Sequence, residues 1–286
     1  MERIVEKANI LIEALPYIKK FRGKEIVIKY GGAAMENKTM RKHILSDLVF
    51  MNYVGIRPIL VHGGGPAISK AMRERGISPR FVDGHRITDQ DTVEVVADTL
   101  ANINKEMVHD ISKMGARAIG LSGYHNEVLN VVKHEELDGD VGFVGDITSV
   151  NIMPIKELTE FNIIPVIYPL GIDENEQMYN VNGDSACARI AVATKAQKLM
   201  VLTGVSGIYR DLGNDDSLLS TVRLKDVHML KEKKIISGGM IPKVDACVQA
   251  LKGGVKKAHI IDGRLKHSLL LEIFTDQGIG TEIIID

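Results

Sequence analysis

The 286-residue sequence contains no tryptophan, only two cysteines and no long apolar run. Cys187 and Cys247 lie far apart in segments of helical pattern, without the paired spacing of a metal site, and we expect two buried thiols. Residues 163–172 are the longest apolar candidate, but two prolines and a glycine interrupt them, whereas a membrane helix needs about 20 consecutive apolar residues. The sequence therefore predicts no membrane partner.

An excess of charge of one sign is also missing. The chain has 36 Lys and Arg against 37 Asp and Glu, which gives a formal net charge of −1. Because the basic residues are dispersed, we expect no positively charged surface that could bind a nucleic acid. Glu2 and Glu6 lie where a secretory signal needs basic residues before an apolar stretch. We expect a cytoplasmic protein without a nucleic-acid partner.

Short β-branched runs alternate with longer stretches of helical period, which predicts an α/β fold with a parallel sheet between helices. Strands are expected at residues 26–28, 59–61, 118–121, 163–167, 199–203 and 258–261. Helices are expected at residues 40–53, 67–75, 91–114, 185–195, 225–233, 243–251 and 266–275. In such sheets ligands bind at the carboxyl ends of the strands.

Two segments depart from this alternation. Between residues 128 and 150, Asp138-Gly139-Asp140 and further glycines separate short strand-like runs, which predicts antiparallel hairpins that could act as a lid. Residues 4–18 carry apolar residues at helical spacing, limited by Pro16 and Gly23. This helix either packs on its own domain or mediates contacts between chains.

Two of the predicted strands run directly into glycine-rich loops, KYGG at residues 29–32 and HGGG at residues 62–65. Each loop precedes a helix, so its backbone N–H groups and the helix N-terminus can bind an anion such as phosphate. The alternative is that these glycines only form tight turns between strand and helix and bind no ligand. Neither loop fits the dinucleotide pattern or the P-loop pattern.

Two lysines strengthen the phosphate interpretation. Lys29 lies on a predicted central strand, where lysine is rare unless its ammonium group reaches a partner at the strand end. Lys243 follows a second rigid turn at residues 237–242. Phosphoryl transfer spreads negative charge over oxygens that two lysines and loop amides could neutralise. Asp184 could cap the helix that it begins, hold the two ammonium groups, or do both.

Five motifs in order along the chain resemble the amino acid kinase family: VIKYGG (27–32), HGGGP (62–66), GHRIT (84–88), YNVNGD (179–184) and GGMIPK (238–243). The closest resemblance is to the branch that phosphorylates N-acetyl-L-glutamate with ATP in arginine biosynthesis. It implies a three-layer αβα sandwich with a mostly parallel sheet. It also implies an N-terminal oligomerisation helix (1–22), an acetylglutamate-binding and dimerisation lobe (23–178) and an ATP-binding lobe (179–286).

The resemblance also implies roles for single residues. Lys29 and Lys243 would stabilise the transferring phosphoryl group, and Asp184 would organise the two lysines rather than act as a base. Gly32 and Gly64 would donate backbone hydrogen bonds.

The acceptor would be bound by Arg86, Asn180 and the amides near Gly65, the arginine through its planar fork. Without the resemblance, Arg86 would be taken as a solvated loop residue. Mg²⁺ would bridge the ATP phosphates without a protein metal site of its own. Besides the two lysines, the expected nucleotide contacts are Thr203, Val205, Ser206, Gly207, Tyr209, Gly239 and Met240.

Arginine-inhibited members of this branch carry an extra N-terminal helix that joins dimers into a hexamer, and a C-terminal signature like HSLLLEIFT (267–275) and GIGT (278–281). The resemblance thus implies a homohexamer inhibited by L-arginine, and it leaves open a PII-type signalling protein as a further partner. The arginine site is expected near Tyr17, His267, Glu272 and Gly280. The alternative is an ordinary amphipathic helix, with His267 an exposed first-turn residue.

Three other functions remain open from the sequence. A sister enzyme of the same fold could phosphorylate a carrier-bound aminoadipate, aspartate, carbamate or UMP. A non-catalytic arginine sensor or scaffold could retain the fold, although the two lysines and Asp184 argue against it. A nicotinamide-dependent dehydrogenase is disfavoured because the glycine spacing lacks the dinucleotide fingerprint.

Overall fold

The structure, a computed structural model, describes residues 2–35, 37–82, 84–135, 140–211, 213–275 and 278–285. Asp138 and Gly139 of the predicted hairpin turn lie outside these residues. The main sheet has eight strands: β1 (Glu25–Tyr30), β2 (Arg57–His62), β5 (Ala118–Ser122), β8 (Ile164–Tyr168), β11 (Lys198–Thr203), β12 (Thr221–Arg223), β13 (Lys257–Asp262) and β14 (Thr281–Ile284). Their order is β12-β14-β13-β11-β1-β2-β8-β5. Only β13 and β14 pair antiparallel, which confirms the mostly parallel sheet.

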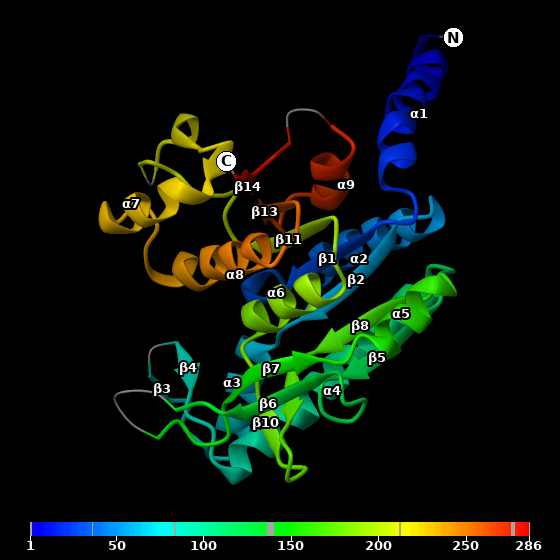
Figure 1. Ribbon diagram of the computed structural model, residues 1–286. Helices are drawn as coiled ribbons and strands as arrows, with labels where there is room; N and C mark the ends of the chain where they lie inside the picture. The colour runs from blue at the N-terminus through cyan, green and yellow to red at the C-terminus, as the bar shows by residue number, and fades with distance from the viewer. Residues whose placement is uncertain are drawn as a thin grey trace.

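Helices cover both faces of this sheet (Figure 1). One face packs against α5 (Met153–Glu160), α6 (Gly183–Ala193), α7 (Val227–Glu232) and α8 (Ile241–Lys252), and the other against α2 (Lys38–Tyr53), α4 (Gln90–Lys113) and α9 (Ser268–Ile273). Successive strand residues point to opposite faces, so Val27 joins the first core whereas Ile26 and Ile28 join the second. Both faces being buried explains the continuous apolar runs of the central strands and confirms the three layers.

A smaller sheet packs beside α6. It contains β6 (Leu129–Lys133), β7 (Gly145–Val150), β9 (Leu170–Ile172) and β10 (Met178–Asn180), in the order β10-β9-β6-β7. The antiparallel pairing of β6 and β7 confirms the hairpin predicted there. Arg189 of α6 donates hydrogen bonds from Nη2 to the carbonyl oxygens of Ile147 (2.9 Å) and Thr148 (2.8 Å). The small sheet is thereby tied to the helix that carries Asp184.

Two further elements frame the edge of the main sheet. A two-stranded hairpin, β3 (Phe81–Val82) and β4 (His85–Arg86), follows α3 (Gly65–Glu74). The sequence did not predict this hairpin, nor the short strands β9, β10, β12 and β14. α9 begins at Ser268, later than predicted, because His267 adopts a left-handed conformation with φ of 58°.

The N-terminal helix α1 (Glu2–Phe21) stands away from the rest of the chain (Figure 1). Pro16 does not limit it. Proline leaves the carbonyl four residues earlier, on Ile12, without its helical donor, but that residue is exposed and water can replace the bond. The apolar side chains of Ile10, Leu11, Ile12 and Leu15 are 41 to 68% exposed.

The predicted division of the chain near Tyr179 falls on a continuous sheet. Four strands come from each side of that point, and the ladder between β1 and β11 joins them. The three-part division of the chain stays a prediction. Cys187 and Cys247 are buried free thiols, as predicted. No helix in the described ranges has the length and apolar character needed to span a bilayer.

We predict that Leu60→Ala lowers the free energy of unfolding by about 2–5 kcal/mol, because Leu60 is fully buried on a central strand and truncation leaves a cavity. Urea unfolding at a fixed protein concentration measures this. Met153→Ala is the control, since Met153 is 57% exposed and should change stability by less than about 0.5 kcal/mol. Equal effects of the two substitutions would contradict the central position of β2.

Candidate functional site

The two glycine loops meet at the carboxyl ends of β1 and β2, next to the end of β11. They approach so closely that a Cβ atom on Gly31 would lie 3.7 Å from the Gly63 nitrogen and 3.0 Å from Lys29 Nζ. A side chain at residue 31 would therefore crowd the path of the Lys29 side chain. The glycines do more here than form tight turns, because they leave room for this lysine beside both backbones.

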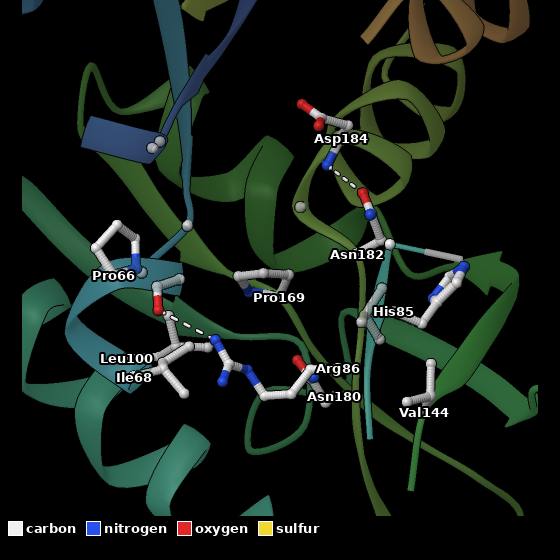
Figure 2. Close-up of a pocket in the computed structure, with 18 of the residues that line it drawn as sticks. Pro66, Ile68, His85, Arg86, Leu100, Val144, Pro169, Asn180, Asn182 and Asp184 are labelled. Atoms are coloured by element: carbon white, nitrogen blue, oxygen red, sulfur yellow. Dashed lines mark hydrogen bonds between the residues drawn. The ribbon is translucent and has the colours of Figure 1, made fainter. Parts of the chain in front are cut away.

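A cavity of about 250 Å³ opens at these loops. Its wall includes seven of the predicted site residues: Lys29, Gly32, Gly64, Gly65, Arg86, Asn180 and Asp184. Figure 2 shows Asp184 at one end of the cavity and Arg86 with Asn180 at the other, with Pro169 between them. The residues come from β1, β4, β10, α6 and the two loops, so the fold collects them from most of the first two-thirds of the chain.

Asp184 binds both predicted lysines. Its Oδ1 atom lies 2.9 Å from Lys29 Nζ, and its Oδ2 atom lies 3.6 Å from Lys243 Nζ. Burial alone would raise the pKa of the Asp184 carboxyl, but the two ammonium groups outweigh it and the pKa is lowered. Asp184 is therefore a carboxylate at neutral pH. The predicted convergence of the two lysines is confirmed by their shared partner.

Asp184 is not the cap of α6, which corrects one of the two roles considered for it. The cap is Asn182, whose Oδ1 accepts hydrogen bonds from the backbone nitrogens of Asp184 (2.8 Å) and Ser185 (3.2 Å). Asparagine satisfies the free N–H groups of a helix start as well as aspartate does. Figure 2 shows Asn182 bound to the Asp184 backbone nitrogen, which leaves the Asp184 carboxylate available to the lysines.

Arg86 is buried, so a solvated loop arginine is the wrong description of it. Its Nη2 donates to the Ser69 hydroxyl (2.8 Å) and to the Gly65 carbonyl (3.1 Å), and its guanidinium carbon lies 4.6 Å from the centre of the Phe81 ring. Burial lowers the pKa of this guanidinium, and Arg73 lowers it further. No Asp or Glu among the described residues forms an ion pair with Arg86, so this wall of the cavity suits an anion.

Asn180 lies next to Arg86 and completes this end of the cavity (Figure 2). Its Nδ2 donates to Thr88 Oγ1 at 3.3 Å, and its backbone nitrogen donates to the Phe143 carbonyl at 2.8 Å. The cavity therefore has an amide and a guanidinium at one end and the Lys29 ammonium at the other, where Asp184 also pairs with Lys243. That arrangement can hold a small molecule that carries anionic groups at both ends.

The residues predicted to bind nucleotide lie at the same edge of the sheet. Thr203 ends β11, and its hydroxyl both accepts from the Val205 nitrogen (2.9 Å) and donates to the Val205 carbonyl (2.8 Å). This exchange fixes the turn that leads to Ser206, Gly207 and Tyr209. Gly239 and Met240 belong to the 3-10 turn before α8, and the Gly239 carbonyl accepts from Lys243 Nζ at 3.2 Å. In the described residues no hydrogen bond joins the two segments, and their nucleotide contacts stay predictions.

The expected arginine residues are only partly brought together. A second cavity, of about 460 Å³, is lined by Tyr17, Glu272 and Gly280. His267 does not line it: its Nδ1 lies 2.6 Å from Asp47 Oδ1, and its side chain remains 41% exposed. His267 thus connects α9 to α2 rather than facing the cavity.

Sequence reasoning missed five charged or titratable residues of this second cavity: Lys20, Lys198, Lys257, His259 and Glu282. Burial lowers the pKa of Lys198 to about 8, with Glu272 and Glu282 opposing the shift. His259 Nδ1 lies 2.6 Å from Glu272 Oε1. Lys198 is the first residue of β11, directly before the predicted strand at 199–203, so a lysine next to a central strand was the available signal.

In the described ranges, no three His, Cys, Asp or Glu side chains are grouped so that they could bind a metal ion. The charged groups that line the first cavity include the Lys29 ammonium, the Asp184 carboxylate and the Arg86 guanidinium, and Lys243 reaches the same carboxylate. Chemically, this set can bind and polarise a phosphoryl group next to a carboxylate.

Comparisons with known proteins agree with this chemistry. The amino acid kinase family model matches residues 24–262. The acetylglutamate kinase of Heliobacterium modesticaldum is 49% identical over 294 residues, covering 99% of this chain and 100% of the relative. The acetylglutamate kinase of Campylobacter jejuni is 46% identical over 281 residues, covering 98% of this chain and 99% of the relative.

Solved structures agree on the fold. The N-acetylglutamate synthase from Neisseria gonorrhoeae, complexed with coenzyme A and N-acetyl-glutamate, has a TM-score of 0.86 at 26% identity; the match covers 98% of this chain but 63% of the synthase. Carbamate kinase from Giardia lamblia has a TM-score of 0.66 at 18% identity over 92% of this chain and 99% of its own, a likeness of fold alone. The chain belongs to the amino acid kinase family and groups there with the acetylglutamate kinases.

Proposed function

We propose that this protein transfers the γ-phosphoryl group of ATP to the side-chain carboxylate of N-acetyl-L-glutamate. The products are N-acetyl-L-glutamyl 5-phosphate and ADP, and the step belongs to arginine biosynthesis in the cytoplasm. The observation that carries the proposal is one cavity lined by Lys29 and Asp184 at one end and by Arg86 at the other, with Lys243 paired to the same Asp184 carboxylate. The choice of acceptor is supported by the names of relatives at 46 to 49% identity over nearly the whole chain.

The reaction forms one bond and breaks one. A carboxylate oxygen of the acceptor attacks the γ-phosphorus, and the bond between that phosphorus and the bridging oxygen of ADP breaks. The attacking carboxylate has no proton to lose at neutral pH, so no general base is required. Lys29, Lys243 and the N–H groups of Gly32 and Gly64 stabilise the charge that spreads over the phosphoryl oxygens.

Asp184 positions the two lysines instead of taking a proton. Its lowered pKa keeps it ionised, so it forms ion pairs with both ammonium groups and holds them beside the loops. Without this carboxylate, the two positively charged ammonium groups would repel each other and move apart.

The non-reacting part of the acceptor lies toward Arg86, Asn180 and Gly65. The guanidinium suits the second carboxylate of acetylglutamate, and the Asn180 amide suits the polar atoms of its acetamido group. The buried guanidinium without a carboxylate partner in the described residues supports this orientation.

ATP fits the opposite end, with its phosphates on the lysines and loop amides, and its base and ribose along residues 203–209, Gly239 and Met240. The described residues offer no metal cage of their own, so Mg²⁺ is expected to be held mainly by the phosphates. When bound, it neutralises phosphate charge.

Regulation by L-arginine at the second cavity forms part of the proposal. Glu272 and Glu282 supply carboxylates for a guanidinium, and Lys198 supplies a cation for a carboxylate. Tyr17 brings α1 to the same cavity, so a ligand there would connect the N-terminal helix to the body of the protein. The exposed apolar side chains of α1 suit a second copy of this helix in a hexamer. A PII-type partner stays a prediction without a structural argument.

We predict that Lys29→Ala lowers kcat by about 100- to 1,000-fold, because it removes one cation from the transferring group. The acyl phosphate formed from acetylglutamate and ATP is trapped with hydroxylamine and quantified. Lys24→Ala, at an exposed position just before β1, serves as the control. A Lys29→Ala enzyme within a few-fold of the parent would refute the catalytic assignment. A panel with aspartate, carbamate and UMP as acceptors tests the sister activities.

Arg86→Lys should raise KM for acetylglutamate about 10- to 100-fold and leave KM for ATP nearly unchanged, since lysine lacks the two-pronged fork of the guanidinium. Steady-state kinetics with each substrate varied in turn separate the two constants. Arg75→Lys is the matched control, because Arg75 forms an exposed ion pair with Asp98 at 2.9 Å. An equal rise in both KM values would place Arg86 outside the acceptor end.

Deletion of residues 1–17 should convert hexamers into dimers and weaken inhibition by arginine, because it removes the exposed apolar face of α1 together with Tyr17. Light scattering gives the mass, and the hydroxylamine assay gives the response to arginine. Leu11→Ser should act in the same direction, whereas Glu13→Ser, at an exposed polar position, should not. Hexamers that persist after the deletion would rule out α1 as the assembly element.

A further inference from the structure

A buried polar network that the proposed mechanism does not use ends at the cavity wall. His62 is the last residue of β2, is fully buried, and directly precedes the second glycine loop. We propose that His62, held by Asn104 of α4, is a positioning residue that directs the Gly64 N–H into the cavity. The inference rests on the proposed function, in which that N–H donates to the transferring phosphoryl group.

The first part of the network fixes one side of the imidazole. Asn104 Nδ2 lies 2.8 Å from the Val166 carbonyl oxygen of β8 and 3.1 Å from His62 Nε2. A backbone carbonyl only accepts, so the side-chain amide must present its nitrogen there. The second N–H of the same amide then faces Nε2, which must accept it.

The second part fixes the other side of the ring. His62 Nδ1 lies 2.9 Å from the Gly63 carbonyl oxygen, which again only accepts, so Nδ1 must carry the hydrogen. One neutral tautomer satisfies both contacts. Burial lowers the pKa of His62 to about 4, although the bond to Gly63 opposes the shift, so the ring is neutral at physiological pH.

The Gly63 carbonyl and the Gly64 N–H belong to one planar trans peptide group, so they point in opposite directions. When His62 fixes the direction of the Gly63 carbonyl, it also fixes the direction of the Gly64 N–H. Two neighbouring polar atoms of the loop are engaged: the Gly63 nitrogen donates to the Tyr30 carbonyl (2.9 Å) and the Gly64 carbonyl accepts from the Ile68 nitrogen (2.8 Å). In the described residues no hydrogen bond uses the Gly64 N–H, and Gly64 lines the cavity.

Glycines at both ends leave room for this network. A Cβ atom on Gly120 of β5 would lie 1.9 Å from Asn104 Oδ1. A Cβ atom on Gly64 would lie 2.8 Å from Leu100 Cδ2, one turn before Asn104 on α4. The helix therefore presses closely against the sheet edge and the loop, and its asparagine reaches the imidazole with little freedom to shift.

Two substitutions of His62 separate positioning from packing. His62→Asn keeps a donor near the place of Nδ1 but is smaller, so it should lower Tm. His62→Leu fills the space better but has no donor for the Gly63 carbonyl. We expect kcat to fall about 10- to 100-fold in His62→Leu, with both KM values within about threefold, and to stay within about fivefold of the parent in His62→Asn.

The reverse order, with kcat following Tm and the Asn variant the slower, would overturn the inference. Crystal structures of both variants supply a readout that does not depend on the acceptor. The Gly63–Gly64 peptide should rotate in His62→Leu and keep its orientation in His62→Asn, and an unmoved peptide in His62→Leu also overturns the inference. Acyl phosphate formation by the unmodified enzyme tests the proposed function separately.

Discussion

The Asp184 carboxylate is the interaction on which the site depends. It lies at the start of α6, close to the carboxyl end of β1, and each of its oxygens faces one ammonium group. Without it, Lys29 and Lys243 would repel each other across a partly buried space and turn toward water. Because Asn182 caps α6, the carboxylate does not have to serve the helix end as well.

The order of strands explains why these groups meet. β1 lies in the middle of the main sheet, with β2 on one side and β11 on the other. The connection that follows β1 runs toward β2, whereas the connection that follows β11 runs in the opposite direction across the sheet. Loops at such a reversal separate and leave a crevice at the carboxyl edge. The two glycine loops border the crevice, and the ladder between β1 and β11 brings the second half of the chain, including Lys243, to the same edge.

Much of this arrangement could be predicted because its signals are local. Alternating strand and helix patterns predicted the layers, and glycines directly after strands predicted the loops. What depends on distant contacts was harder to predict. The burial of Arg86 comes from Met72, Ser69 and Phe81, which only the fold brings to it. The sequence offers Asp184 as the cap of α6, whereas the cap is Asn182, because both residue types suit a helix start. β9, β10 and β12 have three residues each, too few for a period to appear.

The continuity of the main sheet has a mechanical consequence. The strands on either side of the β1–β11 ladder belong to one hydrogen-bonded surface, so the two halves of the enzyme do not swing on a loose linker. A narrowing of the crevice has to come from sheet twist or from parts outside the sheet. The β3–β4 hairpin and the small sheet, which carry Arg86 and Asn180, are such parts. In the proposed reaction, the wall with Arg86 and Asn180 would thus be free to adjust to the acceptor, while Lys29 stays fixed on a central strand of the main sheet.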